Sequence, residues 1–161
     1  MPRTTVVIWD RTKSGRSACL RILEPEKWVQ VAAEAGNGLE VMAAVARLEP
    51  RILLIHTNML ERKDIKLLWA LRQKSPRTKP ILLTRRLSEK TILEAFSHGV
   101  RGYLQESAIS TFLPKAVRLV DAGQVWVPRK MVARVINRLA HLTSRGEDSD
   151  VGLKYLGPKS N

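Results

Sequence analysis

Five residues with chemically active side chains follow short apolar segments of this chain, each within two residues. They are Asp10, Arg11, His56, Thr84 and Glu106. Together they offer two carboxylates, an imidazole, a hydroxyl and a guanidinium, which are groups that bind metals, move protons or contact phosphate. If the apolar segments are parallel strands, their carboxyl ends meet at one edge of a sheet, where open α/β sheets gather functional groups. We therefore expect these side chains to form one site.

Hydrophobic periodicity predicts the elements that would position this site. Short apolar runs bounded by charges, Gly or Pro predict strands at residues 5–9, 28–32, 52–55, 80–83 and 102–104. The segments between and after them carry apolar residues at helical spacing, which predicts helices at 14–23, 38–48, 63–74, 88–97 and 110–120. Strands that alternate with helices imply right-handed crossovers and a parallel sheet covered on both faces. The predicted fold is a three-layer α/β sandwich.

Several residues mark the expected ends of these helices. Ser88 and Ser110 precede helical patterns and offer side-chain oxygens to the unpaired amides of a helix start. Gly99 and Gly123 follow such patterns, at positions where a positive φ costs glycine little.

The composition predicts one globular domain with a short appendage, because the chain has 161 residues, of which 44% are hydrophobic and 27% charged. Its single cysteine, Cys19, cannot form an internal disulfide, and we expect a buried thiol in a reducing cytoplasm. The first apolar run is too short for a signal peptide or a membrane span. The formal net charge of +13 favours polyanions such as nucleic acid or acidic protein surfaces, although a solvated basic surface accounts for it equally well.

Five sequence segments follow one another in a specific order and spacing. They are EAGNGLEVMAAV (34–45), EPRILLIHTNML (49–60), ILLT (81–84), HGVRGYLQES (98–107) and AVRLVDAGQVWVP (116–128). Together they resemble the receiver domain of bacterial two-component response regulators, in the subgroup that carries a LuxR-type helix-turn-helix. The resemblance covers about residues 4–128. It implies a flavodoxin-like (βα)5 receiver fold with the strand order 2-1-3-4-5.

Most of the chemistry of that family is missing from this sequence. The resemblance implies an aspartate after the third strand that accepts a phosphoryl group, two acidic residues after the first strand that hold Mg²⁺, and a lysine after the fifth strand. Here His56 stands at the acceptor position, Arg11 replaces the second acidic residue and Glu106 stands at the lysine position. Leu60 replaces the family's proline. The positions that match are Asp10, Thr84 and Tyr103.

These replacements predict a receiver that is not phosphorylated and that binds no metal or other cofactor. Mg²⁺ prefers oxygen ligands, and the guanidinium of Arg11 would repel it. Glu106 would repel an incoming phosphoryl group. Because a base stands where an acid is expected and an acid where a base is expected, we expect Arg11 and Glu106, with Asp10 and His56, to form a fixed polar network.

Other interpretations of His56 stay open. It could accept a phosphoryl group or sense pH, since imidazole titrates near neutrality, or it could fill the old acceptor site as a neutral side chain. A metal site built from His56, Asp10, Glu106 and His98 is conceivable, but Arg11 would lie among its ligands.

Two of the matching residues are interpreted as structural. Thr84 is expected to be a retained structural hydroxyl. Tyr103 is expected to be a half-buried aromatic, whose role in the family is to couple phosphorylation to a change at the surface.

An amphipathic, basic linker helix is predicted after the receiver-like domain, which we place at residues 1–128, and within residues 129–145. Its apolar face follows the i, i+3, i+4, i+7 pattern in Val132, Val135, Ile136 and Leu139, and its basic face carries Lys130, Arg134 and Arg138. Such an apolar face can also pair with a second copy. The resemblance implies a linker to a DNA-binding domain, but residues 146–161 are too few for its trihelical core and are expected to be a disordered tail.

The sequence therefore predicts a non-enzymatic, cytoplasmic regulator that is independent of phosphorylation and acts by homodimerisation or by docking a protein partner. The resemblance implies two interaction surfaces. The first lies on the first and fifth helices, with Leu20, Leu23, Leu113 and Val117, and the second lies on the fourth helix and fifth strand, with Arg85, Arg86, Lys90 and Arg101. Two alternatives are a nucleic-acid-binding accessory protein that uses its basic face and residual phosphotransfer through His56.

Overall fold

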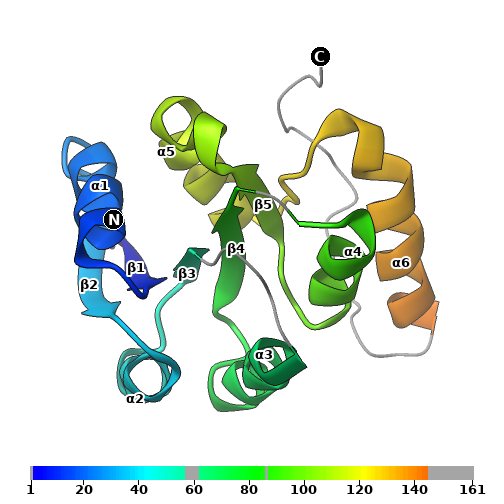
Figure 1. Cartoon of the computed structure of the whole chain (residues 1–161), viewed down its shortest axis with the longest axis horizontal. Coiled ribbons are helices and arrows are strands. Elements are labelled where there is room, and N and C mark those ends of the chain that lie inside the picture. Colours follow the sequence, from blue (N-terminus) through cyan, green and yellow to red (C-terminus); the bar gives the residue numbers. More distant parts are fainter. Residues whose placement is uncertain (1, 57–61, 86, 145–161) are drawn as a thin grey trace.

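The computed structural model describes residues 2–56, 62–85 and 87–144, in which strands and helices alternate as predicted (Figure 1). In chain order the elements are β1 Thr4–Asp10, α1 Lys13–Leu23, β2 Val29–Ala35, α2 Gly38–Leu48, β3 Ile52–His56, α3 Arg62–Lys74, β4 Lys79–Thr84, α4 Glu89–Ser97, β5 Gly102–Gln105, the 3-10 turn η1 Glu106–Ala108, α5 Ile109–Asp121, the 3-10 turn η2 Arg129–Met131 and α6 Val132–Ser144. All the predicted strands and helices are present, and their ends differ from the predicted ones by only a few residues.

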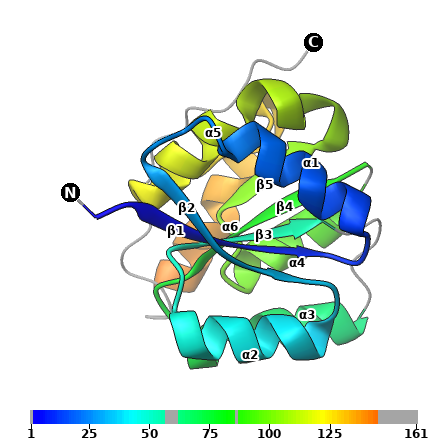
Figure 2. The ribbon, with the colours of Figure 1, turned by 90° about the vertical axis from the view of Figure 1, so that its left-hand side faces the viewer.

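The five strands form one parallel sheet in the order β2-β1-β3-β4-β5, which confirms the predicted fold and strand order. Helices α1 and α5 cover one face of the sheet, and α2, α3 and α4 cover the other (Figures 1 and 2). Helix α6 lies beside α4 (Figure 1). In the part of the chain that the structure describes, no helix is long and apolar enough to cross a membrane.

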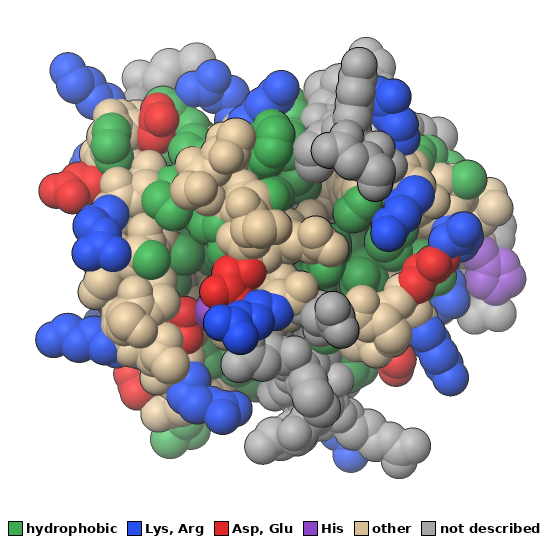
Figure 3. Space-filling model, turned by 45° about the horizontal axis from the view of Figure 1, so that its top comes forward, with side chains coloured by type: hydrophobic (Ala, Val, Ile, Leu, Met, Phe, Trp, Pro, Cys, Tyr) green, Lys and Arg blue, Asp and Glu red, His purple; other side chains and the backbone are tan. Residues whose placement is uncertain are grey.

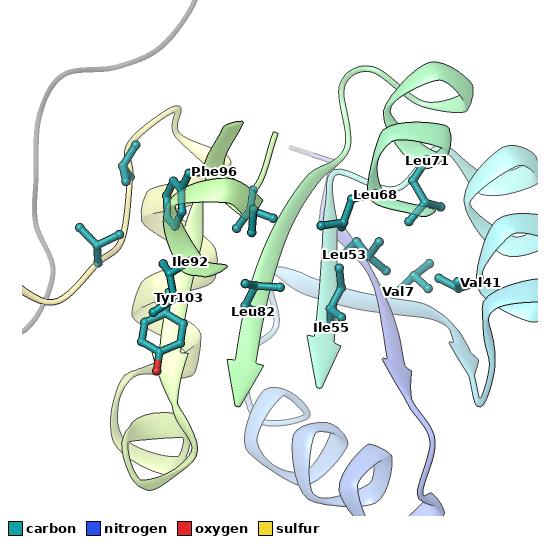
Figure 4. Close-up of a cluster of buried hydrophobic side chains, with 14 of the residues drawn as sticks. Val7, Val41, Leu53, Ile55, Leu68, Leu71, Leu82, Ile92, Phe96 and Tyr103 are labelled. Atoms are coloured by element: carbon teal, nitrogen blue, oxygen red, sulfur yellow. The ribbon is translucent and has the colours of Figure 1, made fainter. Parts of the chain in front are cut away.

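The core is divided by the sheet into two layers, because successive strand side chains point to opposite faces. Val7, Leu53 and Leu82 join the layer that packs against α2, α3 and α4, part of which is drawn in Figure 4. Their neighbours Ile8 and Leu54 join the layer beneath α1 and α5. A parallel strand buried on both faces must be apolar at consecutive positions, which explains the continuous hydrophobic runs in the sequence.

The free edge of β5 is covered by the segment that follows α5. The amide of Tyr103 donates to the carbonyl of Trp126 at 2.8 Å, and the amide of Trp126 donates to the carbonyl of Arg101 at 3.0 Å. The Trp126 side chain is buried, and its ring centroid lies 5.8 Å from that of Phe112. This segment pairs the backbone groups of an edge strand that would otherwise be exposed.

The linker helix α6 packs on the domain itself. Met131, Val135 and Leu139 are buried in the same hydrophobic cluster as Ile92 and Phe96 of α4. The predicted apolar face is therefore confirmed. Its contacts within the chain correct the idea that this face is available to pair with a second copy. The predicted tail at 146–161 lies outside the described residues.

The first expected interaction surface is also mainly core. Leu23, Leu113 and Val117 are at most 1% exposed, and Leu20 is partly buried against them. These residues hold α1 and α5 against the sheet and do not form a surface, which corrects the expectation. Cys19 lies in the same layer at 2% exposure, so the predicted buried thiol is confirmed.

The predicted helix ends are confirmed with one exception. Ser88 Oγ accepts a hydrogen bond from the Thr91 amide at 3.1 Å, and Gly99 and Gly123 have φ angles of +102° and +94°. Ser110 does not cap α5, because a 3-10 turn precedes this helix and shifts its start to Ile109. That turn continues into α5 without a side-chain cap, which the spacing of apolar residues does not reveal.

Candidate functional site

Asp10 is the fixed point of the candidate site, at the carboxyl end of β1. Its side chain is 3% exposed, and its Oδ1 accepts hydrogen bonds from the Thr12 amide at 2.8 Å and the Thr12 hydroxyl at 3.1 Å. The same hydroxyl accepts a hydrogen bond from the Gly15 amide and so caps the start of α1. The loop between β1 and α1 thus orients the carboxylate of Asp10.

His56 ends β3 and is paired with Asp10 in the sheet register. Its Nδ1 lies 2.9 Å from Oδ2 of Asp10, and its side chain is 19% exposed. This buried Oδ2 accepts no hydrogen bond from any described residue. Its contact with His56 Nδ1 is therefore a charge interaction, in which the imidazole faces the carboxylate. A side chain at position 15 has no room, because an added Cβ at Gly15 would lie 1.7 Å from the same oxygen.

The other side of the His56 ring faces a second carboxylate. Oε2 of Glu106 lies 3.9 Å from Nε2 of His56 and 3.1 Å from Nε of Arg85. The Arg85 side chain is 78% exposed, so this outer pair is far more solvated than the pair of His56 with Asp10. The four side chains form an alternating row of carboxylate, imidazole, carboxylate and guanidinium.

The guanidinium in this row belongs to Arg85 and not to Arg11, which corrects the expected network. Arg11 is exposed and forms no hydrogen bond or ion pair with any residue in the described ranges. It is the first residue beyond β1, where the chain turns into the loop before α1. Arg85 directly follows β4, which lies beside β3 in the sheet.

Sequence reasoning missed three residues that support the site. Thr12 and Gly15 fix the loop after β1, and Arg16 donates from Nη1 to the carbonyl of Asp10 at 2.7 Å. Nε of Arg16 also lies 3.3 Å from Glu34 at the end of β2. The Thr12 hydroxyl placed three residues before Gly15 is a capping signal that could have been found in the sequence.

Comparison with known proteins identifies the fold family of this site. A family model for the response regulator receiver domain matches residues 6–118. The chain belongs to this family. Asp10 and His56 thus lie at the carboxyl ends of two inner strands of a receiver sheet.

Similar proteins include transcriptional regulators of bacteria. The receiver is 26% identical over 132 residues to the transcriptional regulatory protein LnrK of Bacillus subtilis (strain 168), a match that covers 82% of this chain and 60% of LnrK. It is 25% identical over 153 residues to the transcriptional regulatory protein DegU of Brevibacillus brevis, covering 94% of this chain and 65% of DegU. The chain therefore spans less than two thirds of the length of these curated relatives.

Solved structures share the receiver fold. A two-component response regulator of the LuxR family from Aurantimonas sp. SI85-9A1 superposes with a TM-score of 0.73 at 19% identity, covering 86% of this chain and 99% of that one. At this identity the likeness shows the fold alone.

Mg²⁺, which the receiver family implies, does not fit the residues of this site. Oδ1 of Asp10 already accepts two hydrogen bonds from Thr12, and Oδ2 faces the His56 ring. An imidazole stands where a hard cation would need a carboxylate. Among the residues that the structure describes, no group of three or more His, Cys, Asp or Glu side chains is arranged to hold a metal ion. The conceivable site with His98 is not formed.

Thr84 and Tyr103 are both buried in this receiver. Thr84 ends β4 at 0% exposure, and its Oγ1 has no hydrogen-bond partner among the described residues. Tyr103 is only 3% exposed and lies in the cluster with Phe96 and Ile92, so the expectation of a half-buried aromatic is wrong (Figure 4). Burial raises the pKa of the Tyr103 hydroxyl, partly offset by a side-chain hydrogen bond with Gln105.

The second expected surface is less free than the sequence suggests. Arg85 pairs with Glu106, and Nη1 of Arg101 donates to the carbonyl of Phe96 in the last turn of α4 and to that of Val100 before β5. Lys90 is exposed, and Arg86 lies outside the described residues. Figure 3 shows acidic and basic side chains in contact near the centre of the visible face.

Two of the three basic residues predicted for the linker helix are also engaged, and the third, Lys130, lies in η2 before α6. Arg134 forms an ion pair with Glu89, and Nη1 of Arg138 donates to Ser97 Oγ at 3.0 Å. Lys130 is exposed. The basic face of the helix is thus used partly to attach α6 to α4.

Proposed function

We propose that this receiver is a cytoplasmic signalling regulator that works without aspartyl phosphorylation and acts by contact with other proteins, not as an enzyme. The observation that carries the proposal is the position of His56, whose Nδ1 lies 2.9 Å from Asp10 Oδ2 at the end of β3. An imidazole cannot form the acyl phosphate of an aspartate. It also supplies the neighbouring carboxylate with a partner that a metal would otherwise provide.

The charge of Glu106 supports the same proposal. Its carboxylate lies on the open side of the His56 ring, 3.9 Å from Nε2. Two like unit charges about 4 Å apart repel by about 4 kcal/mol at an effective dielectric constant near 20. A phosphoryl group that approached His56 would meet this repulsion, partly relieved by Arg85. We therefore disfavour residual phosphotransfer through His56.

The burial of Tyr103 suggests how such a receiver stays in one conformation. In the family, the aromatic at the position of Tyr103 couples phosphorylation to a change at the surface. Here Tyr103 is packed in the cluster that also holds Met131 and Val135. Moving it outward would disturb the packing of α6. We infer that the output surface stays in one conformation, ready for its partner.

The partner surface that we favour is the exposed part around the start of α4. Lys90 is exposed there, in the first turn of α4, and the exposed Arg85 precedes this helix in the sequence. A positive surface fits an acidic partner, and such contacts weaken when salt screens them. The partner at this surface can also be a second copy of the chain.

Treatment with a small phosphodonor tests the proposal. The full chain is incubated with acetyl phosphate and Mg²⁺, and its intact mass is recorded. We expect no phosphoryl adduct. The matched positive control is the variant Arg11→Asp/His56→Asp/Glu106→Lys, which restores the family's residues and is expected to gain an adduct.

Two results would contradict the proposal. An adduct on the unaltered chain that disappears in His56→Ala would establish phosphotransfer through this histidine. An adduct that persists in His56→Ala but is lost in Asp10→Ala would show that Asp10 has become the acceptor.

Sedimentation of the full chain tests the homodimer form. A dimer that dissociates as salt rises, and that is weakened by Lys90→Glu but not by Lys115→Glu, supports a contact through the start of α4. A monomer at all concentrations excludes homodimerisation and requires a different protein partner.

A further inference from the structure

The edge of the sheet opposite the candidate site carries a cation before every strand or at its first residue. Strands of a parallel sheet all start at the same edge, which in Figure 2 is the side where the N-terminus lies. The residues in strand order are Lys27, Arg3, Arg51, Lys79 with Arg77, and Arg101. The receiver fold itself does not need cations at these positions, because strands are started by backbone pairing.

Backbone hydrogen bonds hold this row in register across the sheet. The Arg51 amide donates to Thr5 at 3.1 Å, the Lys79 amide donates to Arg51 at 2.9 Å, and the Arg101 amide donates to Pro80 at 2.9 Å. At the other end the Thr4 amide donates to Trp28 at 2.7 Å. Neighbouring strands lie about 4.8 Å apart, so the row is about 19 Å long.

Some of these cations are used inside the domain. Arg51 pairs with Asp121 at 2.6 Å. Lys79 donates from Nζ to the carbonyl of Val120 at 3.4 Å, and burial lowers its pKa. Arg101 donates to the carbonyl of Val100. These three side chains are engaged in contacts within the domain. The remaining cations of the row are not, so they can contact a ligand.

Three cations of the row remain available. Arg3, Lys27 and Arg77 are exposed, and none of them forms a hydrogen bond or ion pair with another residue that the structure describes. Arg47 and Lys74, in the last turns of α2 and α3, are exposed at the same edge. The acidic side chains there are Glu24, Glu26, Glu49 and Asp121, of which Glu26 accepts from Trp28 Nε1 and Asp121 pairs with Arg51.

Helix dipoles do not account for this row. Cations are favoured in the last turn of a helix, which explains Arg47 and Lys74. Arg3, Lys27 and Arg77 lie outside the helices, so the preference of cations for the last helical turn does not explain their positions. Their unpaired charges repel one another within one edge, which is a cost that a bound polyanion would remove.

We propose that this basic edge binds the phosphate backbone of nucleic acid without sequence specificity. Arginine and lysine in a row match phosphates, which follow each other along one strand every 3.4 Å of rise. Contacts to a phosphate backbone require cations in a row and no apolar anchor. The exposed large hydrophobic residues of the described chain, Leu39 and Trp69, lie in the first turn of α2 and in the middle of α3, away from the strand starts. This activity is additional to the proposed protein contact and uses the opposite edge of the sheet.

The test measures binding of the full chain to a fluorescent DNA duplex of mixed sequence by anisotropy over a range of salt concentrations. Log affinity should fall linearly with log salt, with about one unit of slope for each phosphate contact. The variant Arg3→Gln/Lys27→Gln/Arg77→Gln is expected to reduce the slope by about 2–3. The matched control, Lys13→Gln/Lys66→Gln/Lys115→Gln, removes the same charge from exposed helix positions and should leave the slope within about 1 of the parent value.

Three outcomes would overturn the proposal. The first is absence of binding to the duplex even at low salt. The second is an equal reduction of the salt slope in the two triple variants. The third is binding to polyglutamate, or to vesicles of anionic lipid, that is tighter than binding to the duplex. Circular dichroism of both variants confirms that they are folded. None of these readouts depends on a phosphodonor. Nucleic-acid binding can therefore fail while the proposed function stands, and the proposed function can fail while nucleic-acid binding stands.

Discussion

Arg138 of α6 donates a hydrogen bond of 3.0 Å from Nη1 to Oγ of Ser97, the last residue of α4. One turn earlier in α6, Arg134 pairs with Glu89 in the first turn of α4. The two helices are therefore joined at both ends of α4. The residues that follow these two arginines in the sequence, Val135 and Leu139, are buried against the domain.

This packing predicts that α6 is part of the cooperative fold. Leu139→Ala is expected to lower the free energy of unfolding by about 2–5 kcal/mol, because it leaves a cavity in the cluster. Arg138→Ala should cost less than about 1 kcal/mol, since its contact is exposed. Urea unfolding followed by circular dichroism measures both, with the exposed Asn137→Ala as the control. If Leu139→Ala is as mild as Asn137→Ala, α6 is not part of the folded unit.

The sequence predicted α6 but not what it contacts, because an amphipathic pattern shows which side of a helix is apolar and not which surface covers it.

The strands were predictable from their apolar residues. The central strands β3 and β4 are buried on both faces, so their sequences are apolar at consecutive positions, whereas the edge strand β2 exposes Gln30 and Glu34. Side chains at strand ends were harder to place. Asp10, His56 and Glu106 do meet, but whether Arg11 or Arg85 joins them depends on the direction in which the chain turns after each strand, and periodicity carries no information on that turn.

The inner and outer pairs of the site should differ in their contribution to stability. His56→Ala is expected to cost about 2 kcal/mol, because it leaves the buried carboxylate of Asp10 without its neighbour. Arg85→Ala should cost less than about 1 kcal/mol, since its pair with Glu106 is exposed to water. Both are measured by urea unfolding at pH 6.

A double-mutant cycle separates the inner pair from the loss of packing. In an Asp10→Asn background the neutral amide needs no cationic partner, so His56→Ala should cost much less than in the parent chain. An equal cost in both backgrounds would show that His56 acts only by filling space.

Gly15 should resist substitution although it lies in a helix. Alanine normally stabilises a helix interior by about 1 kcal/mol relative to glycine. Here the added Cβ would lie 1.7 Å from Asp10 Oδ2, so Gly15→Ala is expected to lower the free energy of unfolding by about 1–3 kcal/mol. In an Asp10→Ala background the carboxylate is gone and only the close approach to Thr12 Oγ1 at 2.9 Å remains, so the same change should cost much less. A gain in stability in the parent chain would mean that Asp10 does not occupy this position.

The thiol of Cys19 should be inert in the folded chain. Burial, with a smaller contribution from the charge of Asp10, raises its pKa from 9.0 to about 11. Because the thiolate is the reactive form, alkylation by iodoacetamide at pH 8 should be roughly a hundredfold slower in the folded chain than in the chain unfolded in urea. The raised pKa also means that this group leaves stability unchanged below pH 9.0 and lowers it as the pH rises from 9.0 through about 11, since only the unfolded chain ionises easily there. Mass spectrometry of the alkylated fraction over time gives the rate, and Cys19→Ser is the control for reaction elsewhere. A folded-state rate within a few-fold of the unfolded one would show that the thiol is accessible and that the layer beneath α1 is not closed.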